Sequence, residues 1–251
     1  MPKLSILAAL KHMIQLIANN WKVAARFSLP WLALLAVLDT WQFLSNPSAN
    51  MTPGNIKFNG STLLLIAVNL VASSSIAVSW HRLILIDEPQ SSVRPFRIDK
   101  TVLSYLRANF VIIIITVVPM IAVIMASTFF PTILLPLWLA LTIAITLFSV
   151  RLALSLPAIA IGRTDFGLQA ALASSQKNNL QIFGLLIATG SIVLGIFVVM
   201  QILISLSHSI SPTLSLPASV IFGIPFQFLV LLLTTAMQTS LYGYFCEGRK
   251  F

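Results

Sequence analysis

The stretch ANFVIIIITVVPMIAVIMASTFFPTILLPLWLALTIAITLFSV, residues 108–150, decides the fold class of this chain. It contains no charged residue over 43 positions, whereas one membrane crossing needs about 20 apolar residues. Its length therefore predicts two transmembrane helices, 109–129 and 133–150, joined by a tight turn at FFPTILLP.

The composition of the whole chain also indicates a membrane protein. Of 251 residues, 58% are hydrophobic and 8% are charged, with a mean hydropathy of +0.97. Soluble domains average roughly 45–50% apolar and about 25% charged residues. We therefore expect an all-α polytopic membrane protein with six transmembrane helices in a single membrane domain over residues 1–251. The expected spans are 24–44, 61–80, 109–129, 133–150, 181–206 and 217–243.

The distribution of lysine and arginine predicts the orientation of these spans. If both termini are cytoplasmic, only Lys57 of the 15 basic residues lies on the outer side, as the positive-inside rule requires. The net charge of +9 then faces the anionic head groups of the inner leaflet. Because the basic residues are scattered singly, they form no nucleic-acid-binding arm, and we expect no nucleic-acid partner. The cytoplasmic basic residues are Lys3, Lys11, Lys22, Arg26, Arg82, Arg94, Arg97, Lys100, Arg107, Arg151, Arg163, Lys177, Arg249 and Lys250.

Three segments that precede the odd-numbered spans are amphipathic. Residues 4–20, 99–107 and 165–177 are each expected to form a helix that lies along the cytoplasmic surface. Asp99 and Asp165 open the second and third of these segments and are expected to cap their helices. The pattern is compatible with three repeats of an interfacial helix followed by a transmembrane hairpin, and equally with six unrelated spans.

An arginine interrupts the apolar segment SVRLALSLPAIAIG, residues 149–162, near the inner end of the fourth span. Arg82 ends the second span in the same way, directly after His81. The first interpretation is that Arg82 and Arg151 anchor these helices at the interface by snorkelling. The alternatives are a cytoplasm-facing lipid or anion pocket formed by Arg82, Arg151 and His81, and a deeply buried charge.

Three amide side chains, Asn69, Gln201 and Gln227, fall within the expected spans. They are expected to make hydrogen bonds between helices, and the alternative is that they line a substrate path. The three histidines lie on separate segments, and Cys246 is the only cysteine, so no metal site, internal disulfide or CxxC pair is expected. The sequence also lacks a phosphate loop, a nucleophile elbow and a carboxylate pair within one span, so we expect no enzyme activity and no cofactor.

The run VRLALSLPAIAIGRTDFGLQAALASSQKNNLQIFGLL resembles the R-x-x-L-x-x-P and A-L-x-x-S pattern of bacterial YciC-like envelope proteins. The same pattern is similar to the membrane domain attached to some glycerophosphodiester phosphodiesterases. The resemblance covers residues 149–190, with weaker similarity at 80–120 and 5–31. It implies a helical protein of the bacterial inner membrane and does not imply hydrolysis, because no phosphodiesterase domain accompanies it.

Two functional hypotheses follow from the sequence. The first is a non-enzymatic accessory or organising subunit that packs with membrane lipids or with a membrane protein partner. The second is a small transporter or lipid-handling protein with a cytoplasm-facing site for an anionic head group. A transporter is expected to gather polar residues at the middle of the membrane, so the positions of the intramembrane amides distinguish the two hypotheses.

Overall fold

The computed structural model describes residues 3–45, 60–89, 94–129, 131–211 and 215–249, and these residues form helices and connecting segments without strands. Six helices in this part of the chain are long and apolar enough to cross a membrane. The predicted all-α polytopic fold is confirmed, and the chain is a multi-pass membrane protein. The helices are α1 (Ile6–Ser45), α2 (Gly60–Leu85), α3 (Lys100–Phe129), α4 (Pro131–Ala153), α5 (Ser155–Ala160), α6 (Leu168–Ser175), the 3-10 turn η2 (Gln176–Asn178), α7 (Asn179–Ile210) and α8 (Ser215–Cys246).

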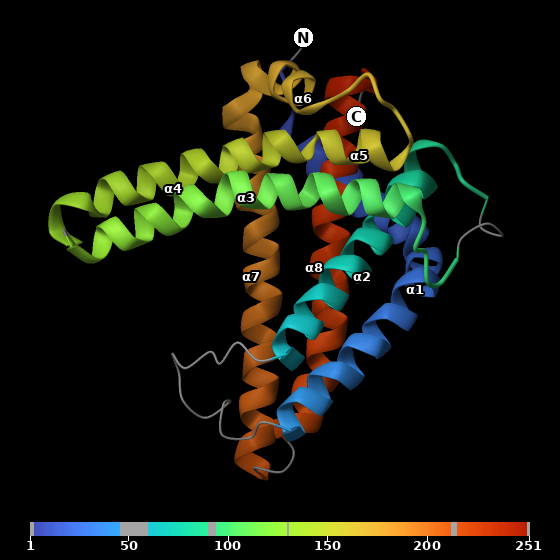
Figure 1. The fold of residues 1–251 in the computed structure, drawn as a ribbon, viewed down its shortest axis with the longest axis vertical. Coiled ribbons are helices and arrows are strands. Elements are labelled where there is room, and N and C mark those ends of the chain that lie inside the picture. Colours follow the sequence, from blue (N-terminus) through green and yellow to red (C-terminus); the bar gives the residue numbers. More distant parts are fainter. Residues whose placement is uncertain (1–2, 46–59, 90–93, 130, 212–214, 250–251) are drawn as a thin grey trace.

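The six predicted spans each fall within one of the long helices, α1 to α4, α7 and α8. Successive long helices pack as the pairs α1–α2, α3–α4 and α7–α8, and α8 also packs against α1 and α2. The N-terminus, the C-terminus and α6 lie at one end of the molecule, which we call the terminal end (Figure 1). Lys57 and Lys250, which the orientation count included, lie outside the described residues.

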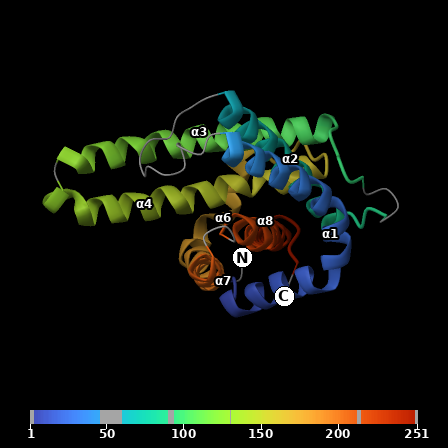
Figure 2. The ribbon, with the colours of Figure 1, turned by 90° about the horizontal axis from the view of Figure 1, so that it is seen from below.

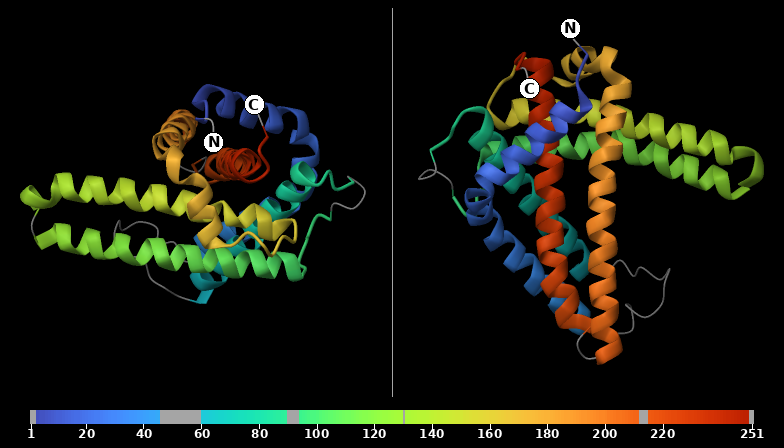
Figure 3. Two further views of the ribbon diagram at one scale, coloured as in Figure 1. Left: turned by 90° about the horizontal axis from the view of Figure 1, so that it is seen from above. Right: turned by 180° about the vertical axis from the view of Figure 1, so that it is seen from behind.

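The α3–α4 hairpin extends crosswise from the α7–α8 pair (Figures 1 and 3). Near its base, α3 packs against α2 and α5, and α4 packs against α6. Farther along the hairpin, apolar side chains such as Ile114, Val118 and Ile121 are 47%, 59% and 53% exposed. Continuous apolar surface of this extent is unfavourable in water, so it indicates contact with lipid.

The buried core lies in the half of the molecule nearest the terminal end. Trp80 of α2 and Phe27 of α1 are almost fully buried against Leu241 of α8 and the residues around it. Tyr105 of α3 belongs to a second cluster with Val78. These clusters hold the helices together at one end, whereas much of the surface of α3, α4 and α7 beyond them is exposed and apolar.

The prediction that three helices are separate from the spans is correct for 165–177 and wrong for 4–20 and 99–107, and their position along the cytoplasmic surface stays a prediction. Residues 168–178 form α6 and η2, distinct from α7, but residues 6–20 and 100–107 are continuous with the spans that follow them. No glycine or proline lies between 6 and 29 or between 100 and 118, so no residue ends the helix at the expected boundary.

The first half of α1 nevertheless has the surface of an interfacial helix. Figure 2 shows α1 bending, so that its first half runs beside α7 and α8 and its second half runs beside α2. Met13 is buried in the core, whereas Leu7 and Trp21 are exposed on an apolar face, and Lys11 and Gln15 are exposed on a polar face. A helix with one face on protein, one apolar face and one polar face is suited to the membrane surface.

The helix of the fourth span breaks shortly after Arg151, and this break has a clear cause. We expect Pro157 to bend or end this helix, and the structure places a break at Leu154, between α4 and α5. Proline lacks the backbone N–H that would bond to the carbonyl four residues earlier, and its ring clashes with that carbonyl. For Pro157 that carbonyl belongs to Ala153, the last residue of α4.

Candidate functional site

A groove with a volume of about 600 Å³ lies where the first three turns of α3 face α5 and the segment that leads to α6. No carboxylate lines it, whereas three cationic side chains, four hydroxyl side chains and several apolar side chains do. We call it the basic groove. Its lining residues are Lys100, Thr101, Ser104, Arg107, Ala108, Val111, Ser155, Ile159, Gly162, Arg163, Thr164, Phe166, Gly167 and Leu168.

Two capping interactions build the walls of the basic groove. The Asp99 carboxylate accepts a hydrogen bond from the backbone N–H of Val102 at 2.9 Å, so the predicted Asp99 cap of α3 is confirmed. At the end of α5, Gly162 adopts a φ of +80°, a left-handed conformation that glycine accepts without strain. The backbone N–H of Arg163 then bonds to the carbonyl of Ala158 at 2.9 Å. This turn reverses the chain and brings it past α3.

The predicted cap at Asp165 is wrong. The structure starts α6 at Leu168 with Gly167 as its N-cap and no side-chain cap. Asp165 instead binds Arg163, with Nε to Oδ1 at 3.1 Å and Nη2 to Oδ2 at 2.6 Å. The hydrogen bond from Arg163 lowers the pKa of Asp165, and the hydrogen bond to Asp165 raises the pKa of Arg163.

Arg163 is fixed on its other side by Tyr242, because its Nη1 donates to the Tyr242 hydroxyl at 3.2 Å. Lys100 and Arg107 differ from Arg163, since neither pairs with a carboxylate in the part of the chain that the structure describes. Both are exposed. The basic groove therefore offers two uncompensated cations to an anion.

The basic groove changes in polarity along α3. Lys100, Ser104, Arg107, Ala108 and Val111 lie at helical spacings that place them on one side of the helix. The charged and hydroxyl groups belong mainly to the first two turns, and Ala108 and Val111 extend the groove toward the apolar part of the helix. This arrangement suits a ligand with an anionic group at one end and a hydrocarbon group at the other.

Arg82, one of the residues that sequence reasoning selected, lies in an ion-pair network. Its Nε is 3.0 Å from Oε2 of Glu88, and Nη1 of Arg97 is 2.9 Å from the same oxygen. Arg97 also binds Asp99 at 2.8 Å, which connects the network to the first turn of α3. Burial raises the pKa of Glu88, but the hydrogen bonds from Arg97 and Arg82 outweigh burial and hold that pKa below its usual value.

Arg151 and His81 have different partners from Arg82. Arg151 donates from Nε to Ser175 Oγ at 2.9 Å and from Nη2 to the carbonyl of Leu172, so it binds the last turn of α6. His81 is completely buried, and its Nδ1 lies 2.9 Å from Thr239 Oγ1. Within the part of the chain that the structure describes, the three residues share no hydrogen-bond partner, and the buried His81 has no surface to present to a head group. The structure therefore does not bring them together as one anion pocket.

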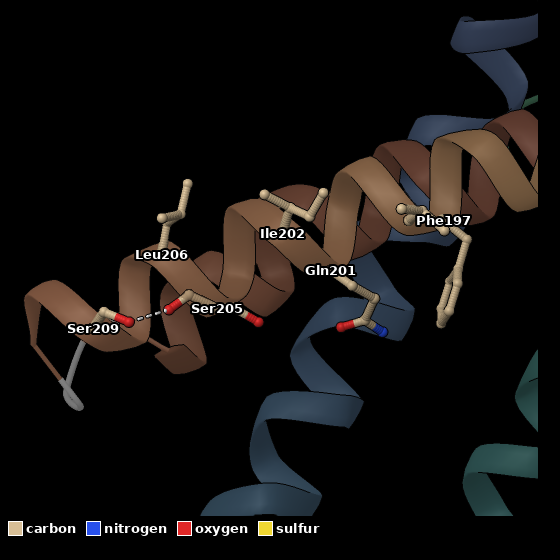
Figure 4. A pocket seen from close by; sticks show the side chains of 7 residues that line it. Phe197, Gln201, Ile202, Ser205, Leu206 and Ser209 are labelled. Carbon is tan, nitrogen blue, oxygen red and sulfur yellow. Dashed lines mark hydrogen bonds between the residues drawn. The ribbon is translucent and has the colours of Figure 1, made fainter.

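The intramembrane amides fall in two places. Asn69 of α2 and Gln227 of α8 line the same cleft, which has a volume of about 220 Å³ and includes residues of α1. Gln201 lies apart from them in a shallow groove along α7, between Phe197 and Ser205 (Figure 4). Asn69 and Gln227 share this cleft, but no direct hydrogen bond joins them in the described structure, so this pair does not form the expected hydrogen bond between helices.

Sequence reasoning did not select the basic groove. From the sequence alone, Lys100, Arg107 and Arg163 are recognised only as cytoplasmic charges that orient the spans. The available signal was the spacing of Lys100, Ser104, Arg107 and Val111, which puts two cations and an apolar residue on one helical side. Within the described residues, no group of three or more histidine, cysteine, aspartate or glutamate side chains is placed to hold a metal ion.

Comparisons with protein-family models, curated proteins and solved structures give no match. The functional interpretation therefore depends on the geometry and chemistry of this chain alone.

Proposed function

We propose that this protein is a non-enzymatic protein of the bacterial inner membrane that packs with anionic lipid, and that it holds the lipid phosphate in the basic groove. The observation that carries the proposal is the pair of exposed, uncompensated cations, Lys100 and Arg107, beside an apolar wall on α3. A phosphate bound there would accept charge-assisted hydrogen bonds from both side chains, and an acyl chain would follow Ala108 and Val111.

The expected orientation supports this position for a head-group site. With both termini cytoplasmic, the terminal end faces the cytoplasm, and the start of α3 lies at the inner leaflet. The negative surface potential of that leaflet attracts basic residues. The apolar face of the first half of α1 is suited to the same membrane surface. The role we propose is that of an accessory or organising subunit whose association with the membrane includes one specifically held lipid.

The proposal is tested by measuring lipids bound to the purified full-length chain. The protein is reconstituted in nanodiscs that contain phosphatidylethanolamine and phosphatidylglycerol, and is then released into mild detergent for native mass spectrometry. The test variant is Lys100→Gln with Arg107→Gln. The control is Lys11→Gln with Lys22→Gln, which removes the same charge from exposed positions on α1 outside the groove.

We expect the wild type and the control to retain one phosphatidylglycerol, and the groove variant to bind it at least tenfold more weakly. Loss of one charge-assisted hydrogen bond costs about 1.5 kcal/mol or more, and about 1.4 kcal/mol corresponds to a factor of ten in affinity. Equal weakening in both variants would show that the lipid responds only to overall charge. No preference of the wild type for phosphatidylglycerol over phosphatidylethanolamine would refute the proposal.

A further inference from the structure

The basic groove carries two positive charges that no carboxylate balances. None of its lining residues is an aspartate or a glutamate. Asp165 balances the charge of Arg163, because its two oxygens accept hydrogen bonds from Nε and Nη2 of that guanidinium. Lys100 and Arg107 have no such partner in the described part of the chain. A ligand with two negative charges would therefore balance the groove completely.

Ser104 adds a third hydrogen-bond donor between these two cations. It follows Lys100 by four residues and precedes Arg107 by three, so it is a neighbour of both on one side of α3. Its side chain is exposed, and its hydroxyl makes no hydrogen bond to another described residue. The side chains of lysine and arginine are long enough to bend toward this central position. Donors from three residues can therefore surround one ligand group.

Phosphodiesters and phosphomonoesters differ in the two properties that this arrangement recognises. The phosphodiester of phosphatidylglycerol has a single negative charge and two unesterified oxygens. A phosphomonoester has three acceptor oxygens and a charge of about −1.5 to −2 at pH 7, because its second pKa is about 6. The three oxygens match the three donors, and the larger charge matches the two cations.

We propose that the basic groove prefers a phosphomonoester lipid, of which phosphatidic acid is the simplest, to a phosphodiester lipid. The phosphate accepts hydrogen bonds from Lys100, Ser104 and Arg107, one at each unesterified oxygen. The inference rests on the proposed function, because it requires that the groove holds a lipid phosphate. It adds a preference among anionic lipids that depends on Ser104 and on the second ionisation of the phosphate.

The apolar lining of the groove favours a lipid over a soluble phosphomonoester. Ala108 and Val111 continue the groove along α3, and Ile159 and Leu168 line it from α5 and α6. A soluble ester such as glycerol 3-phosphate presents the same phosphate but has no hydrocarbon chain to place against these side chains. Only the lipid can contact both the polar and the apolar parts of the groove.

The protein groups around the groove keep their charges between pH 5.0 and 7.5. Burial raises the pKa of Asp99, but hydrogen bonds from Val102 and Arg97 outweigh burial and hold that pKa below its usual value. The hydrogen bond from Arg163 lowers the pKa of Asp165. Lysine, arginine and tyrosine have ordinary pKa values of about 10 or more. A change in lipid affinity over this range therefore reports the charge of the ligand. The titratable groups in and beside the groove are Asp99, Lys100, Arg107, Arg163, Asp165 and Tyr242.

The first test compares lipids on the wild-type chain and needs no variant. Dioctanoyl phosphatidic acid and dioctanoyl phosphatidylglycerol are titrated into the detergent-solubilised full-length protein, and their affinities are measured by calorimetry. At pH 7.5 we expect phosphatidic acid to bind at least fivefold more tightly. At pH 5.0 only about a tenth of the phosphomonoester has its second charge, so we expect its affinity to fall at least threefold. The affinity for phosphatidylglycerol should stay within twofold.

The second test removes the central hydroxyl. We expect Ser104→Ala to weaken the binding of phosphatidic acid at pH 7.5 at least threefold and that of phosphatidylglycerol less than twofold. The control Ser209→Ala removes an exposed hydroxyl near the end of α7, outside the groove, and should change neither affinity. Equal effects of Ser104→Ala on the two lipids would contradict the role of this hydroxyl as the third donor.

Three results with the wild type would overturn the proposal. They are equal affinities for the two lipids at pH 7.5, an affinity for phosphatidic acid that does not change with pH, and displacement of phosphatidic acid by an equal concentration of glycerol 3-phosphate. Tighter binding of cardiolipin at both pH values would also overturn it, because cardiolipin carries its two charges on separate phosphodiesters.

The variant Lys100→Gln with Arg107→Gln separates this inference from the proposed function. If the wild type binds the two lipids equally and the variant weakens both at least tenfold, the groove holds a lipid phosphate but has no preference for a phosphomonoester. If the variant binds both lipids as tightly as the wild type does, the proposed function itself is wrong.

Discussion

Arg151 fastens α6 to α4, and its replacement should loosen α6 selectively. Two hydrogen bonds join its guanidinium to Ser175 and to the carbonyl of Leu172. A hydrogen bond from a charged donor contributes about 1.5–3 kcal/mol, and because Arg151 is half-buried we take the lower value for each bond. Arg151→Leu should therefore destabilise the docked α6 by about 3 kcal/mol. Arg151→Lys keeps one donor nitrogen in place of two and should cost about 1.5 kcal/mol.

Hydrogen–deuterium exchange of residues 168–178 measures this loss directly, because local opening controls the exchange of these amides. With a factor of ten for each 1.4 kcal/mol, exchange should accelerate roughly 100-fold in Arg151→Leu and roughly tenfold in Arg151→Lys. Arg26→Leu, which removes an exposed arginine from α1, should leave this segment unchanged. The interface anchor that the sequence favours gives a different result, because lysine also snorkels and should replace an anchoring arginine. Exchange in Arg151→Lys that equals the wild type would refute the docking role and support that simpler interpretation.

Two further predictions follow from the ion pairs and from the charge distribution. The pKa of Glu88 is lower in the folded protein than its unfolded value of about 4.3. The ionised carboxylate therefore stabilises the fold above pH 4.3, and this stabilisation is lost as the pH falls through the folded pKa. Glu88→Gln should therefore lower the free energy of unfolding at pH 7 by about 2 kcal/mol and should flatten the fall of that free energy below about pH 4. Profiles of unfolding free energy against pH that run parallel for the variant and the wild type would contradict this. Reporter fusions after Lys250 and at Asn55 should give cytoplasmic and periplasmic signals, respectively. The reverse result at either position would show that the orientation is wrong.

The long helices could be predicted because hydropathy alone determines them. A stretch such as 108–150 is long and apolar enough for two membrane-spanning helices, and the structure forms α3 and α4 there. The extent of the helices toward the terminal end was harder to predict. Amphipathic residues such as those of 6–20 continue a helix when no glycine or proline ends it, whereas Asn178 and the 3-10 turn around it separate α6 from α7.

The basic groove and the direction of the α3–α4 hairpin could not be predicted from the sequence. Lys100 and Arg163 are 63 positions apart, and only the turn at Gly162 brings the second residue beside α3. The hairpin direction depends on packing near its base, where α3 contacts α2 and α5. Farther out, the apolar side chains of α3 and α4 have no pattern that selects one neighbour over another, since nearly all of them are suited to lipid.

The arginines at the ends of the even-numbered spans perform a common task that explains their position. Each one follows or ends a span and donates to a backbone carbonyl in the last turn of a different helix. The last four carbonyls of a helix lack partners within that helix, and the negative end of the helix dipole attracts a cation there. The three bonds run from Arg82 to Ala160 at the end of α5, from Arg151 to Leu172 near the end of α6 and from Arg249 to Leu85 at the end of α2.

Because α2, α4 and α8 all contribute one such arginine, the bonds tie three hairpins together at the terminal end. The same role in each hairpin is what a threefold repeat would produce, and it accounts for an arginine within an apolar segment without requiring a buried charge.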